Sequence, residues 1–130
     1  MTLNDPLANV LSHIKNYEKL GKKELSTTNN SKIIRKVLDI MKDEGYIAGY
    51  EEISNGKGGL LKITLRGQIN NCGVIKPRFK VKVTDYEKFE KSFLPAMDFG
   101  IIIVSTNKGL MTHIRAKEQN LGGTLVSFAY

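Results

Sequence analysis

The chain of 130 residues has room for one ordinary hydrophobic core or for two small domains, and its 41% hydrophobic content excludes a disordered protein. The net charge of +7 is uneven, because residues 1–65 carry ten basic and eight acidic residues, whereas residues 66–130 carry ten basic and five acidic residues. A basic half is typical of a protein with a polyanionic partner, most often nucleic acid, although solubility alone would also explain it. The single cysteine excludes an internal disulfide, and no apolar run is long enough for a membrane span.

The chain begins with a predicted helix and a short strand. Asp5 is suited to cap the helix, and Pro6 follows at the first helical position, where its missing N–H costs nothing. Apolar residues then recur at helical spacing until Gly21, which marks the end of the helix. Residues 22–26 could form a short strand. The first residues contain no basic region followed by an apolar stretch, so we expect no secretory signal and a cytoplasmic location.

A second helix and a β-hairpin complete the first half of the chain. Asn30 or Ser31 can cap the helix, and Gly45 ends it. Two strand-like runs, residues 46–53 and 60–66, flank a segment rich in Asn and Gly, which is a strong signal for a hairpin. The predicted order is therefore helix, strand, helix, strand, strand.

The composition changes near residue 68, where we place a domain boundary. The predicted fold class is α+β, with two small packed α/β-type domains. The N-terminal α/β domain comprises residues 1–68, and residues 69–130 form a mainly β domain with short helices. The elements expected in this second domain are an extended basic segment (74–84), a short helix from Asp85 to Pro95, a buried strand (99–105), a short helix from Thr112 and a closing strand (124–130).

No group of residues in the sequence indicates catalysis, a cofactor or a metal, so we expect a protein that is not an enzyme. His13 and His113 lie far apart, and one cysteine cannot supply a zinc-ligand set of the usual spacing. The segment around Lys57 lacks the first glycine and the hydroxyl residue of a phosphate-binding loop. Ser105 and Lys108 have the spacing of an acylating serine enzyme but none of its companion motifs.

The polar segment after the apolar strand is the strongest functional candidate. Ser105, Thr106 and Asn107 place three short hydrogen-bonding side chains where a buried strand emerges. Lys108 adds a cation, and Gly109 permits a tight turn. Side chains this short, held by a rigid strand, can approach a base edge or a ribose 2′-hydroxyl of a distorted RNA site. A turn without any ligand would explain the same residues.

A second segment of small residues could contribute to the same surface. It comprises Gly122, Gly123 and Thr124, at the start of the closing strand. These residues would lie beside Ser105 if the closing strand pairs with the buried strand. A simple turn is again the alternative.

A basic stretch from Lys76 to Lys82 could contact RNA phosphates. Lys76 and Arg78 alternate with apolar residues, so that in a strand their charges would share one face. Such a face can position a protein on RNA without reading its sequence. A solvated strand face is an equal alternative. The aromatic residues between 86 and 93 could stack on bases, but their helical spacing favours a core stripe.

Several of these blocks together resemble the eighth small-subunit ribosomal protein family, in order and over nearly the whole chain. The blocks are Asp5-Pro6-Leu7-Ala8-Asn9, a helix from Ser31-Lys32 to Glu44-Gly45-Tyr46-Ile47, the stretch from Val104 to Thr112, and Leu121-Gly122-Gly123 before a terminal aromatic residue. The segments around residues 70–77 and 86–95 look more like archaeal or eukaryotic members of the family than bacterial ones.

The resemblance implies a structural constituent of the ribosome. Such a protein would bind the central domain of small-subunit rRNA directly, support the assembly of that domain and lie beside other small-subunit proteins. Carried over, residues 105–107 would contact bases and sugars, residues 122–124 would line the same surface, and Asn4 and Lys32 would belong to the N-terminal region that contacts the RNA backbone. The alternative is a protein–protein adaptor that does not bind RNA.

Overall fold

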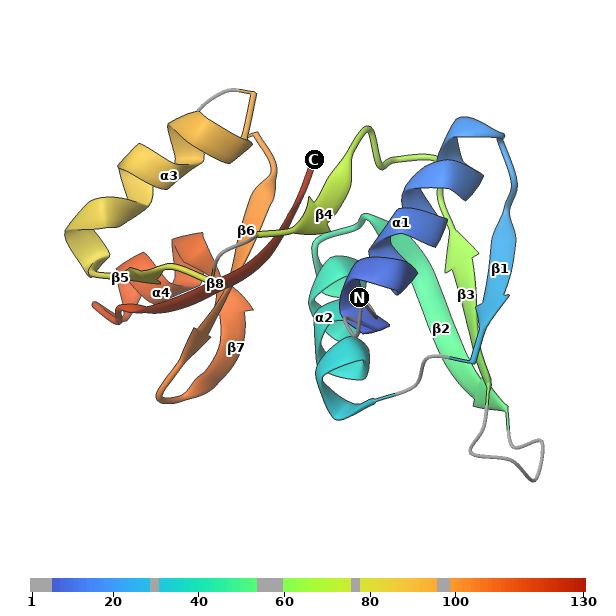
Figure 1. The fold of residues 1–130 in the computed structure, drawn as a ribbon, viewed down its shortest axis with the longest axis horizontal. Coiled ribbons are helices and arrows are strands. Elements are labelled where there is room, and N and C mark those ends of the chain that lie inside the picture. Colours follow the sequence, from blue (N-terminus) through green and yellow to red (C-terminus); the bar gives the residue numbers. More distant parts are fainter. Residues whose placement is uncertain (1–5, 29–30, 54–59, 76–77, 96–98) are drawn as a thin grey trace, which may run out of the picture. The chain divides into compact units, whose positions relative to one another are not determined.

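The computed structural model describes residues 6–28, 31–53, 60–75, 78–95 and 99–130 (Figure 1). The chain folds as two compact units, of which the first ends at Cys72 and the second begins at Gly73. Helices and antiparallel sheets occur in both, as the predicted α+β class requires. Within the described ranges, no helix is both long and apolar enough to cross a membrane.

The first unit packs two helices against a three-stranded antiparallel sheet with the order β1-β3-β2 (Figure 1). The buried side of the sheet carries Leu61, Ile63 and Leu65, which alternate with more exposed residues along β3. The elements are α1 (Pro6–Lys19), β1 (Glu24–Thr27), α2 (Lys32–Asp43), β2 (Ile47–Ile53) and β3 (Leu60–Leu65). Their order is the one that the sequence predicts.

Local capping explains where helix α2 begins and ends. The Ser31 hydroxyl accepts a hydrogen bond from the Ile34 N–H at 3.4 Å, so Ser31 is the N-cap of α2. Gly45 follows this helix with φ 83°, a conformation that favours glycine. The predicted caps Asp5 and Asn30 lie outside the described residues.

The second unit is built on a sheet in which β8 is the central strand. The order is β4-β8-β6-β7, and β5 also pairs with β8. The strands are β4 (Cys72–Val74, at the unit boundary), β5 (Lys80–Val81), β6 (Ile101–Thr106), β7 (Gly109–Thr112) and β8 (Gly123–Ala129). The helices are α3 (Tyr86–Phe93), preceded by the 3-10 turn η1 (Val83–Asp85), and α4 (His113–Glu118).

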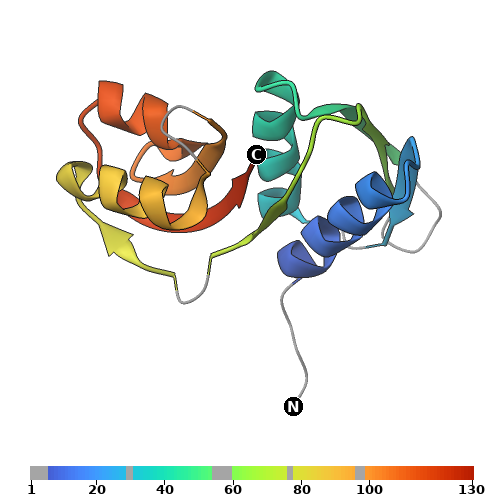
Figure 2. The ribbon, with the colours of Figure 1, turned by 90° about the horizontal axis from the view of Figure 1, so that it is seen from above.

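The helices of the second unit lie next to each other (Figure 2), where Lys117 of α4 contacts Glu90 of α3 at 2.6 Å. Tyr86 and Ala116 bring both helices into the core of this unit. The other buried members of this core are Ile75, Val81, Leu94, Ile102, Val104, Met111 and Leu125. One face of the sheet is therefore covered by the helices.

Three features of the second unit differ from the predictions. Phe99, the first residue of the predicted buried strand, is 49% exposed and precedes β6, which begins at Ile101. The basic segment 74–84 is not one extended strand, because Lys80–Val81 is separated from β4 and leads into η1. Strand β7 is not predicted by the sequence, although it pairs with β6 to form a hairpin. The aromatic residues between 86 and 93 belong to the core, as their helical spacing predicts. Tyr86 is fully buried, and Phe89 and Phe93 pack against the core.

Candidate nucleic-acid interface

The hairpin between β6 and β7 presents the polar segment at the surface. Ser105 and Thr106 end β6, Asn107 and Lys108 form the two-residue turn, and Gly109 begins β7. Gly109 has φ 107°, a backbone conformation that L side chains rarely adopt. Thr106 is half-buried and the other four residues are exposed, so the segment is accessible to a ligand.

Thr106 shapes this turn with its own hydroxyl group. The hydroxyl donates a hydrogen bond to the Gly109 carbonyl oxygen at 2.9 Å and accepts one from the Lys108 N–H at 3.1 Å. A hydroxyl has one proton and two lone pairs, so Thr106 retains the capacity to accept one further hydrogen bond. In this structure Thr106 holds Asn107 and Lys108 in place, a positioning role that the sequence did not reveal.

The start of β8 lies directly beside the end of β6. Ser105 and Thr124 are Cα partners in the antiparallel pair. A Cβ atom built on Gly123 would lie 2.3 Å from the Ser105 carbonyl oxygen, and one built on Gly122 would lie 2.6 Å from the Val81 carbonyl oxygen. Any larger residue at either position would push the strands apart. The glycines therefore allow the close strand pairing that brings the two predicted small-residue segments together.

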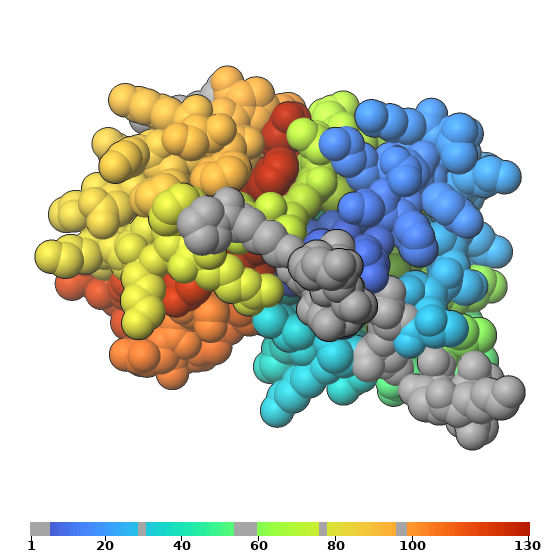
Figure 3. Space-filling model, in the orientation of Figure 1, coloured from blue at the N-terminus to red at the C-terminus, as the bar shows by residue number. Residues whose placement is uncertain are grey.

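The basic stretch forms the edge of the same sheet. Lys80 is the Cα partner of Thr124, and the Phe79 carbonyl oxygen accepts a hydrogen bond from the Leu125 N–H at 2.9 Å. Arg78, Lys80 and Lys82 are exposed. In Figure 3, the side chains of β5 and α3, drawn in yellow, reach the surface of the molecule. The alternation of basic and apolar residues in the sequence predicts that Lys80 lies on a charged strand face. The pairing register of β5 and β8 shows in addition which residues lie next to it.

The remaining predicted residues fall elsewhere. Lys32 is the first residue of α2 and is exposed on the first unit, so the structure does not group it with the hairpin residues within one unit. Asn4 and Lys76 lie outside the described residues. The described part of the candidate interface is therefore formed by residues of the second unit: Arg78, Ser105, Thr106, Asn107, Lys108, Gly109, Gly122, Gly123 and Thr124.

A buried polar group supports the fold behind this surface. Glu90 Oε1 lies 2.6 Å from Lys117 Nζ and 3.3 Å from His113 Nε2. His113 is buried, and its Nδ1 atom accepts a hydrogen bond from the Ile102 N–H at 3.1 Å. His113 therefore contacts strand β6 through Ile102 and helix α3 through Glu90. Sequence reasoning missed the group, although the position of Glu90 between Tyr86 and Phe93 on the apolar stripe was a signal.

The single cysteine of the chain, Cys72, is buried and has a structural role. Burial raises the pKa of the Cys72 thiol to about 12, and the thiol donates a hydrogen bond to the Leu11 carbonyl oxygen at 3.4 Å. A thiol in such an environment is not a nucleophile at neutral pH. No cluster of three or more His, Cys, Asp or Glu residues that could hold a metal ion exists within the described ranges.

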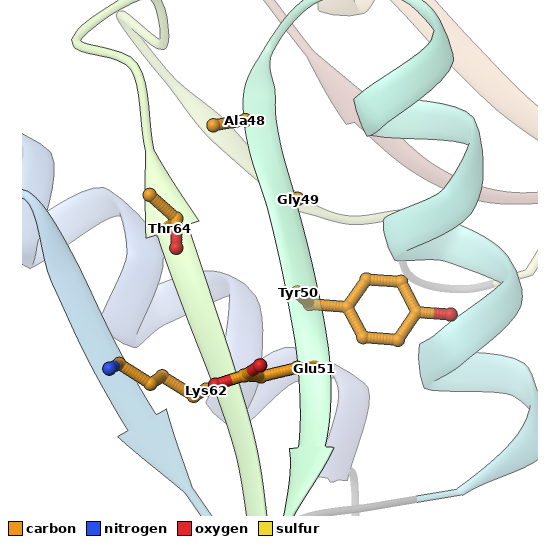
Figure 4. Close-up of a pocket in the computed structure, with 6 residues that line it drawn as sticks. All are labelled: Ala48, Gly49, Tyr50, Glu51, Lys62 and Thr64. Atoms are coloured by element: carbon orange, nitrogen blue, oxygen red, sulfur yellow. The ribbon is translucent and has the colours of Figure 1, made fainter.

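A shallow hollow of about 280 Å³ lies on the sheet of the first unit (Figure 4). Lys62 lines it and pairs with Glu24 at 3.5 Å. Tyr50 points away toward α2, where its hydroxyl donates to Asp39 Oδ1 at 2.8 Å. The Tyr50 and Lys62 side chains are thus engaged with the protein itself, so the hollow offers weaker evidence for a ligand than the hairpin surface does.

Comparison with known families agrees with the resemblance. The family model described as ribosomal protein S8 matches residues 5–130, nearly the whole chain. Members of this family are rRNA-binding structural proteins of the small ribosomal subunit and are not enzymes. The match also spans both folded units and includes the complete hairpin segment. The chain belongs to the ribosomal protein S8 family and is a ribonucleoprotein constituent of the small ribosomal subunit.

Proposed function

We propose that this protein binds the central domain of small-subunit rRNA directly and supports the assembly of that domain. The observation that carries the proposal is the pairing of Ser105 with Thr124 at the exposed end of β6. This register places short polar side chains from two distant segments side by side on a rigid sheet. Such a surface suits an irregular RNA site, in which unstacked bases and 2′-hydroxyl groups are accessible.

The side chains of the hairpin have different capacities for this contact. No hydrogen bond within the described ranges engages the Ser105 hydroxyl, so it can both donate to and accept from a base or a ribose. The exposed Asn107 amide can also do both, whereas Thr106 can only accept. We therefore assign the leading base or sugar contacts to Ser105 and Asn107.

Cations around the hairpin would hold the RNA backbone. Lys108 is exposed in the turn, and Arg78 is exposed beside β5. Phosphate contacts of this kind position a protein on RNA without specifying its sequence. Lys32, Asn4 and Lys76 stay predicted backbone contacts within the same proposal. The protein would act in the cytoplasm, within the ribosome, next to other small-subunit proteins.

A filter-binding titration with central-domain RNA tests the proposal. Ser105→Ala should raise the dissociation constant about fivefold, the effect of losing one hydrogen bond worth about 1 kcal/mol. Ser26→Ala is the matched control, because Ser26 is an exposed strand serine of the first unit. The control should bind like the unmodified protein, and RNA from another rRNA domain should bind more weakly.

Two results would contradict the proposal. One is equal affinity for central-domain RNA and for an unrelated rRNA domain of the same length. The other is unchanged central-domain affinity in both Ser105→Ala and Asn107→Ala, since these side chains are assigned the leading contacts. An adaptor protein would instead associate with its partners without RNA and with little sensitivity to salt.

A further inference from the structure

Edge strand β5 carries a cation in register with the hydroxyl groups of the candidate interface. Lys80 is the Cα partner of Thr124, and Thr124 is in turn the Cα partner of Ser105. Directly opposed residues of antiparallel strands point to the same face of the sheet. The three side chains therefore form one row across β5, β8 and β6, which we call the Lys80 row.

Burial on the two faces of the sheet supports this orientation. Val81 and Leu125, the neighbours of Lys80 and Thr124, are buried in the core beneath the helices. Because side chains alternate along a strand, Lys80 and Thr124 point to the opposite face. Ser105 and Lys80 are exposed there, and Thr124 is half-buried. The row is thus accessible from the side that α3 and α4 do not cover.

Lys80 differs in its surroundings from the lysines that form ion pairs within the protein. Lys62 pairs with Glu24 and Lys117 pairs with Glu90. Within the described ranges, no carboxylate forms an ion pair with Lys80. An exposed ammonium without an internal acidic partner can bind an external anion without first breaking an ion pair.

We infer that Lys80 binds a phosphate of the nucleotide whose ribose or base contacts Ser105 and Thr124. Neighbouring strands lie about 4.8 Å apart, so the Cα atoms at the two ends of the row are roughly 10 Å apart. The ammonium of a lysine side chain can bridge much of this distance. The Lys80 row is thus a single nucleotide subsite with a cation at one end and hydroxyl groups at the other. This inference rests on the proposed function.

The test compares variants in the RNA titration at several salt concentrations. Lys80→Gln should weaken binding about three- to tenfold, and it should reduce the slope of log affinity against log salt by about 0.7–0.9, the value for one phosphate contact. Lys91→Gln is the matched control, because Lys91 is an exposed lysine of α3 on the helical side of the same unit. The control should leave the slope unchanged.

A double mutant locates the phosphate. If Lys80 and Ser105 hold the same nucleotide, the loss in Lys80→Gln/Ser105→Ala should be smaller than the product of the two single losses. Two results would overturn the inference while leaving the proposed function intact. One is a loss of RNA affinity in the double mutant equal to the product of the two single losses. The other is a salt-dependence slope for Lys80→Gln equal to that of Lys91→Gln. Failure of the unmodified protein to prefer central-domain RNA would overturn both. Circular dichroism of each variant confirms that it is folded.

Discussion

Removal of the Glu90 carboxylate should destabilise the second unit strongly. This carboxylate is 5% exposed and contacts Lys117 Nζ at 2.6 Å and His113 Nε2 at 3.3 Å. Because the Ile102 N–H donates to His113 Nδ1, the proton of the neutral ring lies on Nε2, facing Glu90. In Glu90→Ala, the Lys117 ammonium and the His113 Nε2–H both lose their carboxylate acceptor, and a cavity replaces the glutamate side chain.

The magnitude follows from the burial of the partners. Breaking a buried ion pair by removing one partner costs about 3–5 kcal/mol. The Lys117 side chain is 33% exposed and can turn toward water, which lowers the expected loss to about 2–4 kcal/mol. Glu90→Gln keeps the shape and an acceptor oxygen for His113, so it should lose only about 1 kcal/mol.

Urea unfolding, followed by circular dichroism, measures these losses. Glu118→Ala is the matched control, because Glu118 is an exposed glutamate of α4, and it should change the unfolding free energy by less than about 0.5 kcal/mol. A Glu90→Ala variant that unfolds at the same urea concentration as Glu118→Ala would refute the reasoning. We expect Glu118→Ala to be the most stable of the three variants, Glu90→Gln to be intermediate and Glu90→Ala to be the least stable.

Two further predictions concern strand packing and pH. Gly123→Ala should lower the unfolding free energy by about 1–3 kcal/mol, because its Cβ would meet the rigid Ser105 carbonyl oxygen at 2.3 Å. Gly49→Ala in β2 is the control. Its Cβ would meet no atom closer than 3.9 Å, so this variant should have nearly unchanged stability in the same urea assay. Burial and the hydrogen bond to Asp39 raise the pKa of Tyr50 to about 12, so the stability that this neutral phenol contributes is present below pH 10 and is lost as the pH rises toward 12. Titration of phenolate absorbance should show a group near pH 12 that is missing in Tyr50→Phe, and an identical curve for that variant would contradict the assignment.

Local rules made much of the fold predictable. Helix α2 begins after a serine that can accept from its third following N–H and ends at a glycine with positive φ, so both ends are encoded by neighbouring residues. The apolar run from Ile101 to Val104 is completely buried, as a continuous hydrophobic strand requires. In each case the sequence signal lies within a few neighbouring residues of the chain.

The features that could not be predicted depend on residues that are distant in sequence. The buried partners of Glu90 come from another helix, 23 and 27 residues later. Strand β7 is short and carries a mixed polar and apolar pattern, so its identity depends on pairing with β6. The hydroxyl of Thr106 is predicted to contact RNA, and the structure shows that it also donates a hydrogen bond to the Gly109 carbonyl oxygen within its own turn. No sequence pattern distinguishes these two uses of a threonine.

Strand register, more than any single motif, determines the chemistry of the candidate interface. The sequence identifies hydroxyl residues near position 105, glycines near 122 and lysines near 80, but it does not order them in space. A shift of β8 by one residue would turn Thr124 into the core and bring Leu125 to the surface, because side chains alternate between the two faces of a sheet. The close contact at Gly123 and the burial of Leu125 both oppose that shift. Packing on the helical side of the sheet therefore fixes which polar groups the candidate interface presents on the other side.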